Sequence, residues 1–222
     1  MKKYAVIVAG GSGQRMGTQV PKQFLLLHGK PVLWYTLDVF LRAYEDMDII
    51  LAAPEEHMET ARTTIYTTIA PHRVRMIAGG VTRWHSVRNG LQLIREEAVI
   101  FVHDGVRCLL STNLVHNCYE QALRLGSAVP VVDSKDSVRV MTEGENSTAI
   151  ERSRVKLVQT PQTFLSNILI PAYAQEYREG FTDEASVVEA HGGKVFLLKG
   201  ETDNIKITTP IDLVIAEKLL FK

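Results

Sequence analysis

The sequence predicts an α/β protein with helices on both faces of a mostly parallel sheet. Short apolar runs alternate along the chain with helical patterns, which is typical of parallel βαβ units. The first apolar run ends in a glycine loop, a common start for a nucleotide-binding sheet. The 222 residues show no linker, internal repeat or low-complexity stretch, so we expect a single domain over residues 1–222.

Six short apolar runs are predicted to be strands of that sheet. They cover residues 4–9, 48–53, 73–78, 98–103, 128–132 and 194–198. Several are separated by stretches with apolar residues at helical spacing, namely Leu33, Leu37, Phe40 and Leu41, then Trp84, Val87, Leu91 and Ile94, then Leu213, Ala216 and Leu220. Thr209-Pro210 before the last stretch suits a helix start.

Residues 134–158 interrupt this alternation. They read as two short strands, 137–141 and 154–158, around a polar tip at 142–147. An isolated hairpin is marginally stable in water, so it needs a surface to pack on. Two interpretations stay open: a hairpin lying on its own domain, or an arm that clasps a second subunit.

Composition excludes several classes of protein. Acidic and basic side chains balance at 25 each, so no global field favours nucleic acid or an anionic membrane. No apolar run approaches the roughly eighteen residues of a membrane span, and the glycine-broken N-terminus does not suit a signal peptide; we expect a cytoplasmic protein. Cys108 and Cys118 lack metal-ligand spacing and the seven histidines are scattered, which disfavours structural zinc.

The most informative segment is YAVIVAGGSGQRMGTQVPKQ, residues 4–23. A strand that ends in glycines presents N–H groups with no side chains in front of them, which suits phosphate oxygens. Arg15 and Lys22 add positive charge nearby. No Gly-Lys pair continues with Ser or Thr, which excludes a Walker loop, and Met16 takes the place of the last glycine of the dinucleotide fingerprint. A tight turn with solvated cations is the simpler alternative.

AGGSGQRMG followed by PKQF resembles the opening of the sugar-nucleotidyltransferase superfamily. Within it, the chain resembles the 2-C-methyl-D-erythritol 4-phosphate cytidylyltransferase family. The further motifs that carry this resemblance are GGVTRWHS at 79–86, HDGVR at 103–107, TPQ at 160–162, TDEAS at 182–186 and DNIK at 203–206. The resemblance spans nearly the whole chain and implies a Rossmann-like three-layer α/β/α sandwich with a mixed, mostly parallel sheet. It also implies a β-arm at 134–158 that builds a homodimer.

The implied reaction transfers CMP from CTP to methylerythritol 4-phosphate and releases pyrophosphate, in the non-mevalonate isoprenoid pathway. By resemblance, the candidate catalytic cations are Arg15 and Lys22, on the triphosphate, and Lys206, at the α-phosphate. Small residues that let a pyrimidine approach the backbone make the candidate nucleotide site, Ala9, Gly10, Gly11, Gly79, Gly80 and Ser86. Arg83, in the same loop, is a candidate for a salt bridge that fastens it. The candidate acceptor site is Asp104, Arg107, Ser137, Arg152, Thr160 and Thr182, with Arg152 reaching over from the partner's arm.

This chemistry needs no general base, because a phosphate monoester has a second pKa of about 6 and is mostly dianionic at neutral pH. The difficulty is to bring two polyanions together, which fixed cations and Mg²⁺ relieve. We expect Mg²⁺ to be held mainly by ligand phosphates, with Asp104 as its candidate protein ligand. Asp104 could instead cap a turn or contact acceptor hydroxyls. Lys206 could instead lie on the solvent face of a strand.

Two other functions stay open. A ribitol-5-phosphate cytidylyltransferase has a similar fold, although TDEASVVEAHG resembles the methylerythritol family better. A non-catalytic CTP-binding module could dispense with Lys22 or Lys206, and both are present. Residues 104–108 read DGVRC where the family usually has Asp-Ala-Ala-Arg-Pro, and Ser137 replaces a more usual threonine. Both departures lie at the predicted acceptor site.

Overall fold

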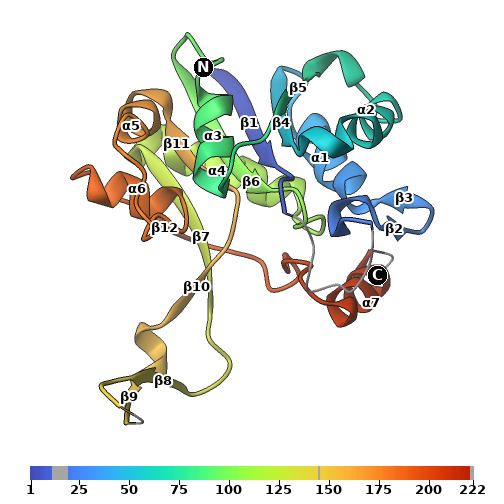
Figure 1. Ribbon diagram of the computed structural model, residues 1–222. Coiled ribbons are helices and arrows are strands. Elements are labelled where there is room, and N and C mark those ends of the chain that lie inside the picture. The colour runs from blue at the N-terminus through green and yellow to red at the C-terminus, as the bar shows by residue number, and fades with distance from the viewer. Residues whose placement is uncertain (12–19, 145, 221–222) are drawn as a thin grey trace.

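The computed structural model describes residues 1–11, 20–144 and 146–220 (Figure 1). Its centre is an eight-stranded sheet with the order β10-β7-β11-β6-β1-β4-β5, in which β12 also pairs with β7. The strands are β1 (Lys2–Val8), β4 (Met47–Ala53), β5 (Val74–Ala78), β6 (Ala98–Asp104), β7 (Ser127–Asp133), β10 (Lys156–Val158), β11 (Gln162–Leu165) and β12 (Leu197–Lys199). The predicted α/β class is confirmed, as are five predicted strands to within two residues; the sixth, β12, begins three residues later than expected.

The sheet is mixed but mainly parallel. β1 lies between β6 and β4 and is parallel to both, and β4 is parallel to β5. β11 is antiparallel to β6 and to β7, and β10 is antiparallel to β7. Because the parallel strands β1 and β6 end beside each other, their carboxyl ends open onto one edge of the sheet, where ligands bind in such folds.

Helices cover both faces of the sheet, as the alternating pattern predicted. They are α1 (Val32–Ala43), α2 (Met58–Tyr66), α3 (Arg83–Leu91), α4 (Thr112–Leu125), α5 (Ser166–Ala172), α6 (Glu184–Ala190) and α7 (Pro210–Leu219). Side chains of α1, α2 and α4 share one core cluster with Ala5 and Ile7 of β1. Side chains of α3, α5 and α6 share another with Val6, which faces the opposite way. None of the helices in these described ranges is long and apolar enough to span a membrane.

A third, smaller core cluster joins the two ends of the chain. It contains Leu27 and Val32 from the N-terminal part and Ile207 and Ala216 from the C-terminal part, packed around Val106. Leu27 belongs to the small sheet of β2 (Leu26–Leu27) and β3 (Lys30–Pro31). The backbone N–H of Ile207 also donates to the carbonyl of Val106 at 3.1 Å. The C-terminal segment is thereby fixed beside the end of β6.

The predicted pairing within the arm is wrong. β8 (Val138–Met141) pairs with β9 (Ser147–Ile150), and residues 156–158 return to the main sheet as β10. The tip is tighter than expected, because the N–H of Thr142 donates to the carbonyl of Asn146 at 3.0 Å and closes the hairpin there. β10 instead satisfies the backbone groups on the edge of β7. Figure 1 shows the β8–β9 hairpin standing away from the sheet.

Candidate active site

A cavity of about 280 Å³ lies at the carboxyl ends of β1 and β6. Five separate segments of the chain form its wall: the glycine loop after β1, the segment around Lys22, the loop before α3, the end of β6, and the DNIK segment. The predicted site residues that line it are Ala9, Gly10, Gly11, Lys22, Gly80, Ser86, Asp104 and Lys206. Arg15 lies outside the described residues. Gly79 is adjacent to this wall in sequence, directly before Gly80.

The loop before α3 depends on small residues. A Cβ on Gly80 would lie 2.3 Å from the Cβ of His85, so no side chain fits there without moving the backbone. The N–H of Gly80 donates to the Ser86 hydroxyl at 3.0 Å, and that hydroxyl donates to the carbonyl of Thr82 at 3.1 Å. Ser86 therefore shapes the loop from within while it lines the cavity.

Gln23 holds the N-terminal glycine loop from behind. Its side chain is almost fully buried, and its Nε2 donates to the carbonyl of Ala9 at 2.7 Å. Lys22, its neighbour in the short 3-10 helix Lys22–Phe24, is largely buried and lines the cavity. Gln23 was part of the PKQF motif but was not predicted as a site residue. The motif was the signal that could have identified it, although nothing in the sequence indicated a partner for its side chain.

Asp104, at the end of β6, is surrounded by cations. Its Oδ1 is 3.1 Å from Arg83 Nε, and its Oδ2 is 2.9 Å from Lys206 Nζ and 3.5 Å from Arg107 Nε. Burial alone would raise the pKa of Asp104, but the charges of Arg83, Lys206 and Arg107 outweigh burial and hold that pKa well below its usual range. Asp104 is therefore a permanent carboxylate that gathers three cations at the cavity.

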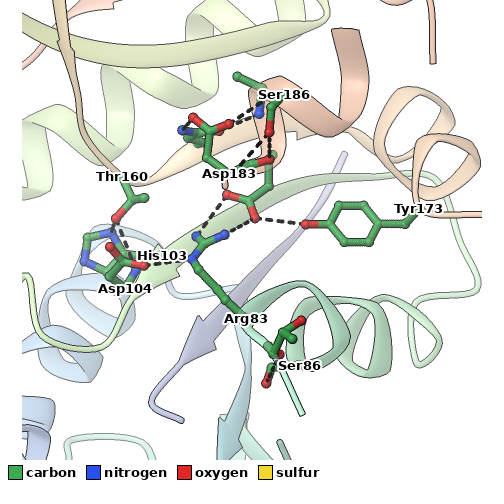
Figure 2. Close-up of polar contacts among 12 residues, drawn as sticks. Arg83, Ser86, His103, Asp104, Thr160, Tyr173, Asp183 and Ser186 are labelled. Atoms are coloured by element: carbon green, nitrogen blue, oxygen red, sulfur yellow. Dashed lines mark hydrogen bonds and ion pairs between the residues drawn. The ribbon is translucent and has the colours of Figure 1, made fainter. Parts of the chain in front are cut away.

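Arg83 also forms the salt bridge that was one of its predicted alternatives. Its Nη1 and Nη2 contact Glu184 Oε1 and Oε2 at 2.5 and 3.0 Å, and the Tyr173 hydroxyl donates to Oε1 at 3.0 Å (Figure 2). Glu184 is completely buried. Sequence reasoning did not identify Glu184 or Tyr173, because no pattern indicates that residues so far apart in sequence meet Arg83.

A second cavity of about 210 Å³ shares Arg83, Asp104 and Lys206 with the first. It is also lined by three residues of the predicted acceptor site, Arg107, Thr160 and Thr182. The hydroxyl oxygen of Thr160 accepts from the N–H of Asp104 at 3.1 Å. Thr182 lies two residues before the start of α6 and is exposed. Because the two cavities share three charged side chains, a group bound in one lies close to a group bound in the other.

His103 packs behind this wall and lines neither cavity. It is fully buried, and burial lowers its pKa to about 3. Its Nε2 lies 3.0 Å from the carbonyl of Arg107, which can only accept, so Nε2 carries the proton. Nδ1 then accepts from the Thr160 hydroxyl at 3.0 Å. His103 is neutral and occupied on both nitrogens, as expected of a packing residue.

Lys206 lies on an irregular segment, so the alternative that placed it on a strand is wrong. The segment is held by Asn204, which is completely buried and whose Nδ2 donates to the carbonyl of Thr160 at 2.9 Å. The carbonyl of Asn204 accepts from Arg107 Nη1 at 2.9 Å. These bonds leave the Lys206 side chain partly exposed at the cavity, with its ammonium at Asp104.

Two predicted acceptor residues are not brought to either cavity of their own chain. Ser137 and Arg152 are exposed on the arm, and Arg152 Nη1 donates to the carbonyl of Lys135 at 3.0 Å. Arg152 instead borders a separate surface hollow with Lys135, Ser153 and Lys156. Within one chain, the acceptor site therefore lacks Arg152, which the family resemblance assigned to it from the partner's arm.

The described residues contain no group of three or more His, Cys, Asp or Glu side chains that could hold a metal ion. Asp104 is the one carboxylate among the described residues lining the first cavity. Mg²⁺ commonly keeps only one or two protein carboxylates and takes its other ligands from phosphates and water. Asp104 is thus the one carboxylate that the described lining offers to such a metal, and ligand phosphates and water would have to supply the rest.

The chain is similar to known proteins over nearly its whole length. The sequence model of 2-C-methyl-D-erythritol 4-phosphate cytidylyltransferase (IspD) matches residues 4–222. Proteins of that name from Bacteroides fragilis and Porphyromonas gingivalis are both 46% identical to this chain, over 220 and 224 residues, with at least 98% of either sequence covered.

Solved structures agree with the sequence relatives. The 4-diphosphocytidyl-2C-methyl-D-erythritol synthase of Anaerococcus prevotii superposes with a TM-score of 0.85 at 26% identity, covering 100% of this chain and 99% of that one. The 2-C-methyl-D-erythritol 4-phosphate cytidylyltransferase of Thermus thermophilus gives a TM-score of 0.76 at 31% identity and covers 99% and 98% of the two chains.

Proposed function

The chain belongs to the 2-C-methyl-D-erythritol 4-phosphate cytidylyltransferase family, and from this premise we propose which residues carry out its reaction. The enzyme transfers CMP from CTP to 2-C-methyl-D-erythritol 4-phosphate in isoprenoid biosynthesis, giving CDP-methylerythritol and pyrophosphate. One observation carries the assignment of roles. Lys22 and Lys206, from opposite ends of the chain, line one cavity together with Gly10, Gly11 and Gly80.

In this proposal, the glycine loop and Lys22 bind the triphosphate of CTP, with Arg15 assigned beside them on the family resemblance. The cytosine lies against Gly79, Gly80 and Ser86, where the absence of side chains lets backbone groups reach its edge. The acceptor lies in the adjoining cavity, against Asp104, Arg107, Thr160 and Thr182. This arrangement is supported by the three charged residues that the two cavities share.

An oxygen of the acceptor's phosphate attacks the α-phosphorus of CTP, a new P–O bond forms, and the bond to the bridging oxygen of pyrophosphate breaks. No proton has to be removed, because the attacking phosphate is already mostly dianionic at neutral pH. The neutral, fully bonded His103 is consistent with this. The ammonium groups of Lys22 and Lys206 stabilise the charge that develops on the α-phosphoryl oxygens.

We propose that the reaction uses Mg²⁺, with Asp104 as the protein carboxylate and the substrate phosphates as the main ligands. When bound, the ion neutralises charge on the phosphates and supports the departure of pyrophosphate. Asp104 accepts from Arg83 on one oxygen and from Lys206 on the other. Each oxygen therefore keeps a lone pair that a metal ion could use.

We also propose a homodimer in which the arm, residues 134–158, completes the partner's site. Three features support it. The β8–β9 hairpin pairs with itself and stands away from the sheet (Figure 1). Its apolar side chains Val140, Met141 and Ile150 are exposed. Arg152 lines neither of the two site cavities of its own chain, which leaves it able to serve another copy, and two-fold dimers are the commonest oligomers.

The remaining partners are small molecules, CTP and a phosphorylated sugar-like acceptor. The balanced charge supports the proposal that neither nucleic acid nor a membrane surface is a partner. A cytoplasmic location stays a proposal, in keeping with two buried free thiols, Cys108 and Cys118.

The experiment is to incubate the protein with CTP, Mg²⁺ and either methylerythritol 4-phosphate or ribitol 5-phosphate, and to follow pyrophosphate. We expect release with methylerythritol phosphate and loss of release in excess EDTA, restored by Mg²⁺. Preference for ribitol phosphate would overturn the assignment of methylerythritol 4-phosphate as the acceptor. No pyrophosphate with either acceptor would support a non-catalytic CTP-binding module. Activity that excess EDTA leaves unchanged would show that the reaction does not need Mg²⁺.

A further inference from the structure

Arg83, which is partly exposed at the cavities, forms an ion pair with the buried Glu184 between the two halves of the site. Arg83 is the first residue of α3 and follows the glycine loop of the nucleotide cavity. Glu184 is the first residue of α6, two positions after Thr182 of the acceptor cavity. Figure 2 shows the Arg83 guanidinium beside Asp104. Its terminal nitrogens contact Glu184. One side chain therefore connects the nucleotide loop, the acceptor loop and the end of β6.

The Arg83 guanidinium donates more N–H groups to Glu184 than to Asp104. Both terminal nitrogens contact the Glu184 carboxylate, at 2.5 and 3.0 Å, in the bidentate geometry that arginine and carboxylates favour. Only Nε is left for Asp104, and it contacts Oδ1 at 3.1 Å. The second oxygen of Asp104 then remains for Lys206 Nζ, 2.9 Å away.

We propose that Glu184 is a positioning residue for cytidylyl transfer: it holds Arg83 away from a bidentate contact with Asp104, so that Asp104 keeps the Lys206 ammonium in place for the α-phosphate. The inference rests on the proposed function of Lys206. Glu184 is completely buried and is not among the described residues that line either cavity, so it acts through Arg83.

Glu184 is itself fixed on its other side. The Tyr173 hydroxyl donates to Oε1 at 3.0 Å, and the Tyr173 ring stacks on Trp84, next to Arg83, with centroids 5.5 Å apart. A buried ion pair often adds little stability compared with apolar side chains of similar size. A need for stability alone therefore does not account for these charges, whereas a need to place the guanidinium does.

The test compares Glu184→Gln, Arg83→Gln and the double variant by steady-state kinetics, with Glu189→Gln, an exposed position on the same helix, as the matched control. In Glu184→Gln, Arg83 is free to take both oxygens of Asp104. We expect kcat to fall at least about tenfold, as loss of an aligned transition-state cation does, while the KM for CTP changes less than about threefold. Glu189→Gln should match the parent enzyme.

The double variant separates positioning from a general structural role. If Glu184 acts through Arg83, adding Glu184→Gln to Arg83→Gln should change kcat less than about twofold. Tyr173→Phe keeps both charges and should lower kcat roughly two- to fivefold, which provides a measurement even if Glu184→Gln does not fold.

The outcomes also separate this inference from the proposed function. A parent enzyme that releases no pyrophosphate would overturn the function itself. An active parent with normal kcat in Glu184→Gln would overturn only the positioning role. The positioning role would also be overturned if Glu184→Gln lowered kcat by the same factor in the parent and in the Arg83→Gln variant. A third such outcome is a Tyr173→Phe variant that is the only one to fold and keeps its full kcat.

Discussion

Gly80 illustrates how closely single residues fit at the nucleotide loop. A methyl group there would meet the Cβ of His85 and backbone atoms of His85 and Ser86, so the loop would have to move. We expect Gly80→Ala to raise the KM for CTP at least about tenfold, because a shifted backbone loses its contacts with the base, while the fold is retained.

The matched control is Gly180→Ala, where a Cβ meets no atom within 4 Å and the φ angle is not positive. It should leave the KM for CTP unchanged. Equal KM values in the Gly80→Ala variant and its parent would show that the base does not approach this loop.

Lys22 supplies one of the fixed charges assigned to the triphosphate. Replacing one preorganised transition-state donor typically costs about a hundredfold in rate, so we expect Lys22→Ala to lower kcat by at least about that factor. Lys218→Ala, at an exposed position on α7, is the control for loss of one positive charge. Near-normal turnover by the Lys22→Ala variant would remove Lys22 from the mechanism.

His103 gives a prediction for stability against pH. Its pKa is lowered from 6.5 to about 3 by burial, so below pH 6.5 the unfolded chain binds a proton that the folded chain does not. The free energy of unfolding should therefore fall as the pH decreases through this window, by about 2 kcal/mol between pH 7.5 and pH 5. Asp104 does not interfere, because its lowered pKa acts only below about pH 4.

Denaturant unfolding at both pH values measures this effect. His103→Gln cannot titrate, so the difference between the two pH values should shrink by about 2 kcal/mol in that variant, with the other histidines cancelling in the comparison. An unchanged difference would mean that His103 is protonated in the folded protein.

Among the secondary-structure elements, those with purely local signals were predicted from the sequence. β1, β4 and β6 are continuous apolar runs, as strands covered on both faces should be. β11 was missed because Gln162 and Thr163 make it look polar, although both are buried. The Gln162 side chain is satisfied by Asp183 and by the N–H of Ala185. No local pattern shows those partners.

The site was predictable to the extent that its residues lie in recognisable motifs. The glycine loop, Lys22, Asp104 and Lys206 were named from sequence and meet at one cavity. Glu184 also lay within a quoted motif, but its role depends on a contact with a residue 101 positions away in sequence. Tertiary pairings of this kind, like the pairing of β10 with β7, require the folded chain.

The arm is the element whose role can be tested without a structure of the dimer. Arg152→Ala and Lys206→Ala should each be nearly inactive alone, the first by loss of the residue donated to the partner and the second by loss of a residue in its own cavity. When the two are unfolded and refolded together, each mixed dimer regains one site with both residues. About a quarter of all sites should then be active, if subunits pair at random.

Arg152→Ala mixed with Arg152→Ala is the control and should stay inactive. Failure of the mixed sample to regain activity, despite dimers seen by sedimentation, would show that Arg152 does not act across the interface.

On the scale of the whole molecule, the fold joins its two ends around one site. The cluster of Leu27, Val32, Val106, Ile207 and Ala216 packs early and late segments together, and Lys22 and Lys206 emerge beside it. The chain as a whole has no net charge, yet four cations, Lys22, Arg83, Arg107 and Lys206, gather near one carboxylate, Asp104. Their concentration at one place, rather than any overall field, is what suits the fold to two polyanionic substrates.

The position of Arg152 on the arm has a consequence for how the enzyme behaves on dilution. If each complete site includes Arg152 of a second copy, only dimers have working sites. The number of working sites then follows the monomer–dimer equilibrium, and dissociated protomers contribute none. Specific activity, measured per milligram, should then decline as the sample is diluted below the dissociation constant of the dimer, and should recover on reconcentration. An enzyme that kept constant specific activity as isolated protomers would be complete within one chain.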